Sequence, residues 1–345
     1  MKRVLITGAA GFVGDLLARR LCAPDAGIER LVLADRARAP VAGPAHWLEG
    51  DLADASFVER LAAERCDTVF HLASQPGGQA EREPGRGRRI NLDATLDLFE
   101  AVARTGTEQG TRPVIVFASS IAVYGTGLPA QIDERTPLYP AMSYGAHKRM
   151  AEIALADFVR RGELDGCSLR LPGIVARPRG PAGQASAFMS ELLHAVAAGE
   201  RFVCPVSAEA SSWWMSGECA VRNLLHAARL EGCAQQPGRT WQLPVLRLRL
   251  AQVVDALADR FGGDRRELVE YRPDDALEAI FGGYPPLDDR PAPAPRFVDD
   301  ATPAAGPGIL GNTTLLGFTP ATQKFTTPIA NNWPLSFDAN DEGFA

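Results

Sequence analysis

The sequence predicts a doubly wound α/β domain, in which helices cover both faces of a mainly parallel sheet, followed by a smaller second lobe. Two observations carry this prediction. Short, almost continuously apolar segments alternate with amphipathic segments over the first half of the chain, as expected for strands buried on both faces between helices. The chain also has 345 residues, which is more than one small core needs.

Each element of the first half follows from its hydrophobic period. The apolar runs predict strands at 3–7, 30–34, 68–72, 113–118 and 168–171. The amphipathic stretches between them predict helices at 11–21, 56–64, 92–104 and 143–161.

The pattern becomes irregular after residue 176. A loop rich in Pro and Gly at 177–183 precedes expected helices at 185–199, 218–230 and 250–261, with strands near Trp241 and at 268–271. We therefore expect one domain at 1–175, to which residues 213–235 return. A smaller lobe is expected from 176–212 and 236–296.

The last segment, 297–345, differs in composition from the rest. Of the 36 basic residues three are Lys, so 33 are Arg, and no Arg lies beyond Arg296. The segment follows a Pro-rich linker at 291–295 and is dominated by Thr, Asn, Pro and Phe. We treat it as an atypical tail to which the sequence assigns no role.

The composition argues against several classes of function. A formal net charge of -6 disfavours a nucleic-acid binder. None of the six cysteines forms a C-x-x-C pair or lies at metal-ligand spacing from a His, so we expect reduced thiols and no metal site. The uncharged run at 114–132 is interrupted by Ser, Gly and Pro, so we expect no membrane span and a cytoplasmic location.

A glycine-rich turn directly follows the first strand and opens the first helix. Its spacing is G-x-x-G-x-x-G, and we expect its residues to bind a cofactor: Gly8, Gly11, Phe12, Val13 and Gly14. The glycines permit a tight turn and close approach of a pyrophosphate, while the helix start offers free N–H groups. The position of this turn predicts a dinucleotide-binding site of the Rossmann type.

Two acidic residues refine the choice of cofactor. Asp35 ends the second strand, where a carboxylate can bind both adenosine ribose hydroxyls and repel a 2′-phosphate. NAD is therefore preferred, although the adjacent Arg36 leaves NADP open. Asp51 and Leu52 occupy a loop position suited to an adenine contact, and the alternative for Asp51 is a solvated loop residue.

A candidate catalytic pair lies on the helix expected at 143–161. Tyr144 and Lys148 are four residues apart and therefore share a helix face. An adjacent ammonium should lower the Tyr pKa, so that the phenol can take a proton from an alcohol. Lys148 is the one lysine between Lys2 and Lys324. Ser120, at the end of an expected strand, can hold the oxygen of a substrate.

Together these motifs resemble the extended short-chain dehydrogenase/reductase family, also called the NAD-dependent epimerase/dehydratase family. The resemblance covers roughly residues 1–230 and rests on 7–14, Asp35, 51–52, 71–74, Asn91, 119–125 and 144–148. It implies that Ser120, Tyr144 and Lys148 are catalytic. Ser119, Tyr124 and His147 are then structural neighbours.

The resemblance also implies the remaining cofactor contacts. Leu72, Ala73 and Ser74 would line the cofactor after the third strand, and Pro172 and Ile174 would contact its nicotinamide end. Asn91 is counted with the cofactor-binding residues, either bracing the site or starting a helix. Members of the family usually form a dimer through two long helices such as those expected at 92–104 and 143–161, so the resemblance also implies a homodimer.

The second lobe distinguishes the substrates of the family. Members that act on nucleotide sugars usually have an Asn near position 171 and an Arg-Asp-Phe run that grips the diphosphate. This chain has Leu-Pro-Gly-Ile at 171–174 and Ser-Ser-Trp-Trp-Met-Ser at 211–216, so a small substrate under an aromatic lid is favoured. The segments 170–178, 186–190 and 204–207 resemble the D-erythronate dehydrogenase group.

The implied activity is NAD-dependent oxidation of the C2 hydroxyl of a small sugar acid, with D-erythronate as first choice and a 2-oxo-tetronate as product. Substrate contacts are expected from Gln75, Ser120, Tyr144 and Arg177, with Arg179 as a further candidate for the carboxylate; either Arg is alternatively a solvated loop residue. Uronate dehydrogenase and nucleotide-sugar epimerase or dehydratase activities are the alternatives. A non-catalytic NAD-binding sensor is disfavoured, since such proteins tend to lose the Tyr or the Lys.

Overall fold

The computed structural model describes residues 1–40, 43–133, 135–180, 185–230, 239–287, 297 and 300, together with the backbone of β13 (Phe318–Thr319) and β14 (Lys324–Phe325). The predicted linker at 291–295, most of the tail and residues 231–235 of the predicted return lie outside the described residues.

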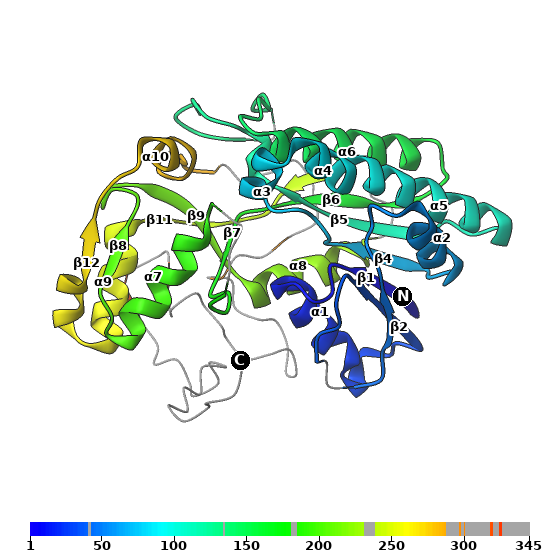
Figure 1. Cartoon of the computed structure of the whole chain (residues 1–345), viewed down its shortest axis with the longest axis horizontal. Coiled ribbons are helices and arrows are strands. Elements are labelled where there is room, and N and C mark those ends of the chain that lie inside the picture. The colour runs from blue at the N-terminus through cyan, green and yellow to red at the C-terminus, as the bar shows by residue number, and fades with distance from the viewer. Residues whose placement is uncertain are drawn as a thin grey trace.

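A seven-stranded parallel sheet forms the centre of the larger domain (Figure 1). Its strands, in sheet order, are β10 (Thr240–Gln242), β6 (Asp165–Leu171), β5 (Val114–Ser120), β4 (Thr68–His71), β1 (Arg3–Thr7), β2 (Arg30–Asp35) and β3 (His46–Glu49). The chain winds outward from β1 in one direction and then restarts at β4 in the other. This confirms the predicted fold class and places a topological switch point, where such sheets bind ligands, at the carboxyl end of β1.

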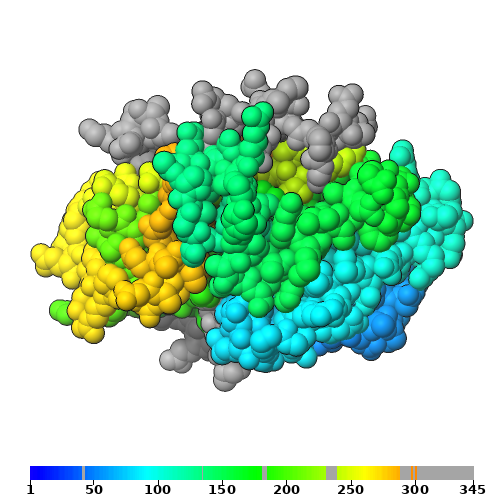
Figure 2. Space-filling view, turned by 90° about the horizontal axis from the view of Figure 1, so that it is seen from above, coloured from blue at the N-terminus to red at the C-terminus, as the bar shows by residue number. Residues whose placement is uncertain are grey.

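Helices cover both faces of this sheet, each over its own apolar core. One face carries α2 (Ala55–Ala63), α5 (Ala94–Gln109) and α6 (Ser143–Arg160); the other carries α1 (Phe12–Cys22) and α8 (Gly217–Ala227). Seen from above, α5 and α6 form a broad cyan-to-green surface (Figure 2). Met150 and Ile153 are exposed on α6, and the homodimer stays a prediction.

The segment between β4 and α5 contains structure that periodicity did not reveal. Two short helices, α3 (Gly77–Arg82) and α4 (Pro84–Arg88), lead into a π-helical turn, η2 (Arg89–Asp93). The expected helix at 92–104 therefore begins as a regular α-helix at Ala94. Such π turns are often found at functional sites.

The smaller lobe packs around its own core, in which aliphatic side chains surround Phe188 and Trp214. It contains a sheet of β11 (Leu246–Arg249), β9 (Ser211–Ser216) and β7 (Gly173–Val175), and a parallel pair, β8 (Phe202–Cys204) and β12 (Val269–Tyr271). Its helices are α7 (Ala187–Ala198), α9 (Leu250–Phe261) and α10 (Asp275–Phe281). No helix in the described part of the chain has the length and apolar character needed to cross a bilayer.

A buried ion pair joins the elements that carry the candidate catalytic residues. The Glu152 side chain on α6 is inaccessible to solvent and accepts hydrogen bonds from Arg170 Nε at 2.9 Å and Nη2 at 3.0 Å on β6. Ser119 on β5 donates to the same carboxylate at 2.6 Å, and Arg170 Nη1 donates to the Tyr124 hydroxyl at 3.3 Å. Three elements therefore converge on one carboxylate.

We predict that Glu152→Gln lowers the free energy of unfolding by about 3–5 kcal/mol, because it leaves the buried Arg170 charge uncompensated. Urea denaturation would measure the change. Glu29→Gln is the matched control, since Glu29 pairs with Lys2 on the surface and should unfold close to wild type. Equal effects of the two substitutions would contradict the prediction.

Candidate active site

A cavity of about 640 Å³ lies at the carboxyl ends of the sheet strands, between the larger domain and the lobe. It has the size of a typical small-molecule site. Of the residues that the sequence singles out for catalysis, cofactor or substrate, all but Asn91 and Arg179 line it: Gly8, Gly11, Phe12, Val13, Gly14, Asp35, Asp51, Leu52, Leu72, Ala73, Ser74, Gln75, Ser120, Tyr144, Lys148, Pro172, Ile174 and Arg177.

The glycine turn forms one end of the cavity and leaves no room for side chains. Gly8 has φ +73°, and a Cβ there would lie 2.7 Å from the backbone nitrogen of Ala73. A Cβ at Gly14 would overlap the carbonyl oxygen of Gly8. Gly11 caps α1 without any side-chain hydrogen bond, so the first N–H groups of α1 are open to an anion. This backbone cradle fits the pyrophosphate of a dinucleotide.

Asp35 and Asp51 mark the adenosine side of the cavity. Asp35 accepts hydrogen bonds from the backbone N–H of Ala10 at 3.0 Å and of Arg36 at 2.7 Å, which orient its carboxylate at the end of β2. Asp51 accepts from Ala53 N–H at 2.9 Å and from Arg86 Nη2 at 2.8 Å. Burial acts to raise the pKa of Asp51, but these hydrogen bonds and the Arg86 charge outweigh it and the pKa is lowered.

Arg86 also lines the cavity, and sequence reasoning missed it. Nothing in an Arg-rich chain marks one Arg of a short helix as a neighbour of Asp51. Only the fold of α4 over the β3–α2 loop brings the two together.

A buried hydrogen-bond chain holds the loop after β4 in place. The Asn91 side chain accepts from Gln75 N–H at 2.7 Å and donates to Gln75 O at 3.0 Å. The Thr95 hydroxyl donates its one proton to Asn91 O at 3.2 Å, so in its 2.9 Å bond to His71 Nε2 the imidazole is the donor. His71 Nδ1 therefore carries no proton and accepts from the Thr7 hydroxyl at 2.7 Å. Of the two roles considered for Asn91, the structure therefore favours bracing, and it braces Gln75 without lining the cavity.

The His71 imidazole in this chain stays neutral. Complete burial, with the nearby Lys148 charge adding to it, lowers the pKa of His71 to about 3. Protonation would cost the acceptor on Nδ1 and break the bond to Thr7. The link between the phosphate loop and the loop after β4 is therefore insensitive to physiological pH.

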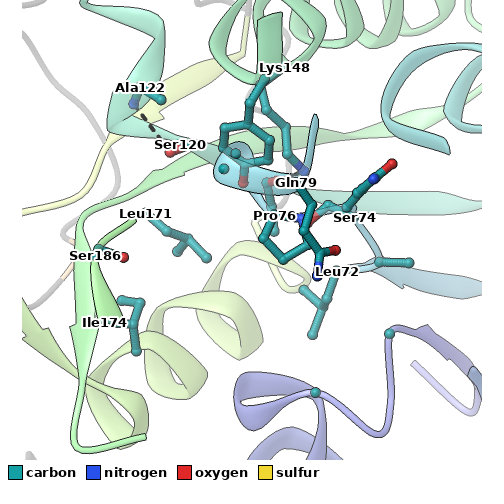
Figure 3. A pocket seen from close by; sticks show the side chains of 18 of the residues that line it. Leu72, Ser74, Pro76, Gln79, Ser120, Ala122, Lys148, Leu171, Ile174 and Ser186 are labelled. Atoms are coloured by element: carbon teal, nitrogen blue, oxygen red, sulfur yellow. Dashed lines mark hydrogen bonds between the residues drawn. The ribbon is translucent and has the colours of Figure 1, made fainter. Parts of the chain in front are cut away.

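Ser120, Tyr144 and Lys148 all line the cavity. Figure 3 shows the side chains of Ser120 and Lys148 in it. Ser120 ends β5, and its Oγ accepts a hydrogen bond from Ala122 N–H at 3.1 Å. Lys148 is only 2% exposed; its Nζ donates to Ala118 O at 2.7 Å and lies 4.6 Å from the centre of the Phe117 ring.

Burial dominates the ionisation of the catalytic pair. It raises the pKa of Tyr144, while hydrogen bonds from Ser74 and Ser120 and the charge of Arg177 act to lower it. It also lowers the pKa of Lys148 to about 7, against the raising effect of Glu152. The expectation that Lys148 lowers the Tyr144 pKa is therefore wrong for this state of the protein. The charge that acts on the phenol is that of Arg177.

Arg177 enters the cavity from a strained backbone position. The preceding Ala176 has φ +61°, a left-handed conformation that is unfavourable for a residue with a Cβ. Two side chains of α7 hold the Arg177 main chain. Ser190 Oγ accepts its N–H at 3.3 Å, and His194 Nε2 donates to its carbonyl oxygen at 2.6 Å.

The Arg177 side chain is held in place without a neutralising partner. Its Nε donates to Ile174 O at 2.8 Å and its Nη2 to Ser186 Oγ at 3.2 Å. Within the described ranges no carboxylate lies at ion-pair distance from it. Arg179, by contrast, is half exposed, pairs with Glu200 and does not line the cavity. The structure therefore places Arg177 at the cavity and Arg179 in a surface ion pair, a difference that the sequence did not show.

Aromatic side chains close the substrate end of the cavity. Trp213 is buried, donates from Nε1 to Pro285 O at 2.8 Å and packs against Tyr284 at 5.0 Å between ring centres. Phe281 and Tyr284 line the cavity together with Ser186, Met189 and Ser212. Sequence reasoning missed Phe281 and Tyr284, because they lie about a hundred residues after Arg177 and no motif surrounds them.

The described residues contain no cluster of His, Cys, Asp and Glu that could hold a metal ion. At the catalytic and substrate end of the cavity the side chains instead present hydroxyls, a phenol, an amine, an amide and the Arg177 guanidinium. With a dinucleotide in the cradle, such a set can transfer a proton and orient a hydroxyl for oxidation.

Comparison with known proteins places this site in a family. Residues 4–229 match the NAD dependent epimerase/dehydratase family. The chain is 36% identical over 292 residues to D-erythronate dehydrogenase from Cupriavidus necator, which covers 82% of this chain and 89% of the relative. It is 32% identical over 287 residues to D-erythronate dehydrogenase from Haemophilus influenzae, covering 82% and 90%.

A solved structure shares the fold over most of both chains. The crystal structure of the nucleoside-diphosphate-sugar epimerase from Agrobacterium tumefaciens matches with a TM-score of 0.77 and 32% identity, covering 84% of this chain and 87% of that chain. The glycine cradle, the orienting carboxylate of Asp35 and the matched span of sequence agree on one cofactor, NAD. The chain belongs to the NAD-dependent epimerase/dehydratase family, and it is an NAD-dependent oxidoreductase.

Proposed function

We propose that this enzyme oxidises the C2 hydroxyl of a small sugar acid, with D-erythronate as the first candidate. The observation that carries the proposal is Arg177, a positioned guanidinium that faces the substrate end of the cavity and has no carboxylate partner among the described residues. A partly buried, unpaired cation is costly unless an anion joins it. The identity to two D-erythronate dehydrogenases supports the same substrate class.

The proposed mechanism assigns one task to each residue. Arg177 binds the carboxylate and thereby sets which carbon of the acid lies near Tyr144. Ser120 orients the C2 hydroxyl, and the Tyr144 phenolate takes its proton. Bound NAD supplies the hydride acceptor, so the C–H electron pair leaves as hydride while the O–H electrons form the carbonyl. Lys148, one turn after Tyr144 on α6, would bind the nicotinamide ribose, as the family resemblance implies.

A nucleotide-sugar epimerase is the second candidate, because the structural match from Agrobacterium tumefaciens has that name. Its substrate would bring a diphosphate to the substrate end of the cavity. Arg177 is the one Arg that the described residues place there, and the 211–216 segment presents Ser212 and Trp213. A uronate would use the same Arg177 contact as erythronate. Cavity chemistry therefore favours a free acid over a nucleotide sugar.

We predict that Arg177→Gln raises KM for D-erythronate by roughly 30- to 1000-fold, as expected when a charge-paired contact is removed. The neutral polyol erythritol, which lacks the carboxylate, should be used poorly by the wild type and no worse by the variant. Steady-state kinetics with both compounds measure this preference.

Arg179→Gln is the matched control for Arg177→Gln, because Arg179 is exposed and paired with Glu200. It should leave KM near the wild-type value. A normal KM for the acid in Arg177→Gln would remove the basis of the proposed substrate class.

We predict that kcat/KM for oxidation rises with pH between about pH 7 and 10, because Tyr144 must lose its proton and burial raises its pKa above the usual value of about 10. Reduction, which needs the protonated phenol, should show the opposite slope.

Tyr144→Phe should lose at least about 100-fold in turnover and keep its affinity for NAD. Turnover near the wild-type level in Tyr144→Phe would mean that another group moves the proton.

A further inference from the structure

Two residues beyond the predicted end of the lobe pack on the larger domain. Phe297 lies against His226 of α8 and Trp241 of β10, with ring centres 5.4 Å and 5.7 Å apart. Asp300 is 1% exposed and contacts Ser216, directly before α8. We call Phe297 and Asp300 the strap, because they contact opposite ends of the same helix. The prediction from composition assigned both residues to the tail at 297–345.

The Asp300 carboxylate is held by the start of α8. It accepts a hydrogen bond from the backbone N–H of Ser216 at 2.7 Å and another from the Ser216 hydroxyl. Ser216 Oγ in turn accepts from Cys219 N–H at 3.1 Å and caps the helix. A carboxylate at a helix N-terminus is favoured by the helix dipole, and charge-assisted hydrogen bonds are the stronger kind. Asp300 and the cap therefore stabilise each other.

The start of α8 touches two walls of the cofactor cavity. A Cβ on Gly217 would lie 2.9 Å from Phe12 Cζ, so the helix start is in close contact with the phosphate loop. Met215, one residue before Ser216, pairs with Ile174 between β9 and β7. Phe12 and Ile174 both line the cavity. Figure 1 shows α8 beside α1, where this contact is made.

Phe297 joins the same apolar core as these wall residues. That core contains Ile174, Met215 and Trp241, and both Phe12 and Phe297 pack against it. Close-packed side chains transmit a shift of one member to the others, because interiors have few voids. Displacement of Phe297 or Asp300 therefore shifts Phe12 and Ile174, which line the cofactor cavity.

We propose that the strap positions α8 for dinucleotide binding: Asp300 and Phe297 hold the helix so that its first turn supports Phe12 and Ile174. Neither residue lines the cavity, so both are positioning residues. Ser120, Tyr144 and Lys148 lie on β5 and α6, across the sheet from α8. The strap therefore acts on the affinity for NAD and leaves the chemical step unchanged. This inference is independent of which acid is the substrate.

The test is the dissociation constant for NAD of the full-length Asp300→Asn protein, measured by calorimetry, together with kcat at saturating NAD. Asp300→Asn should raise the dissociation constant about three- to tenfold, since one charge-assisted contact to the helix start is weakened. The turnover number at saturation should remain at the wild-type value. A residue that only stabilised the fold would lower the melting temperature without moving the NAD affinity of the folded protein.

Three further variants keep the test decisive. Ser216→Ala should raise the dissociation constant similarly, and the double variant with Asp300→Asn should be no worse than the weaker-binding single variant, because both break one contact. Phe297→Leu tests the other end of the strap with a mild change in volume. Asp264→Asn removes an exposed carboxylate after α9 and should bind NAD normally.

Wild-type affinity for NAD in folded Asp300→Asn and Phe297→Leu proteins would overturn the proposal. So would additive effects of Asp300→Asn and Ser216→Ala, since independent effects would mean that the two residues do not act through one contact. If Asp300→Asn does not fold, Ser216→Ala and Phe297→Leu decide the question by the same measurement.

Discussion

The active site depends on one buried carboxylate, Glu152, which ties together three elements from distant parts of the chain. Arg170 and Ser119 both bind it, and burial of these charges is tolerable only while the pairing is complete. Ser120 follows Ser119 on β5, and on α6 Tyr144 lies two turns and Lys148 one turn before Glu152. The position of each catalytic group thus follows from the geometry of one ion pair.

Backbone atoms dominate one end of the cavity, and side chains dominate the other. Backbone atoms recognise the dinucleotide: glycines that exclude side chains, an uncapped helix start and a carboxylate oriented by backbone N–H groups. Side chains build the substrate end, where a left-handed Ala176 turns Arg177 into the cavity and α7 holds it there. Backbone recognition suits a cofactor shared by a whole family, whereas Arg177 can specify one class of substrate.

Local sequence was enough for the cofactor end and for the catalytic groups, because each lies in a motif of fixed spacing next to a strand or helix. The scarcity of lysine in the chain further supported the assignment of Lys148 as a catalytic residue. Sequence reasoning could not find Arg86, Ser186, Phe281 or Tyr284, since only tertiary packing brings them to the cavity. It also misjudged the Tyr144 pKa, because burial, which no motif reports, outweighs the hydrogen bonds and the Arg177 charge that act to lower that pKa. It did not predict the contact of Asp300 with the start of α8, because the composition of 297–345 had set that segment apart from the folded domain.

We propose that a positioned Arg177 makes this NAD-dependent oxidoreductase specific for a small free acid. The most direct measurement follows, with the wild type, NADH formation from D-erythronate and from a hexuronate, and the appearance of an epimerised product from UDP-glucose, at equal concentration. We expect the highest kcat/KM for D-erythronate and no epimerised product from UDP-glucose. Turnover of a nucleotide sugar, with no oxidation of any free acid, would contradict it.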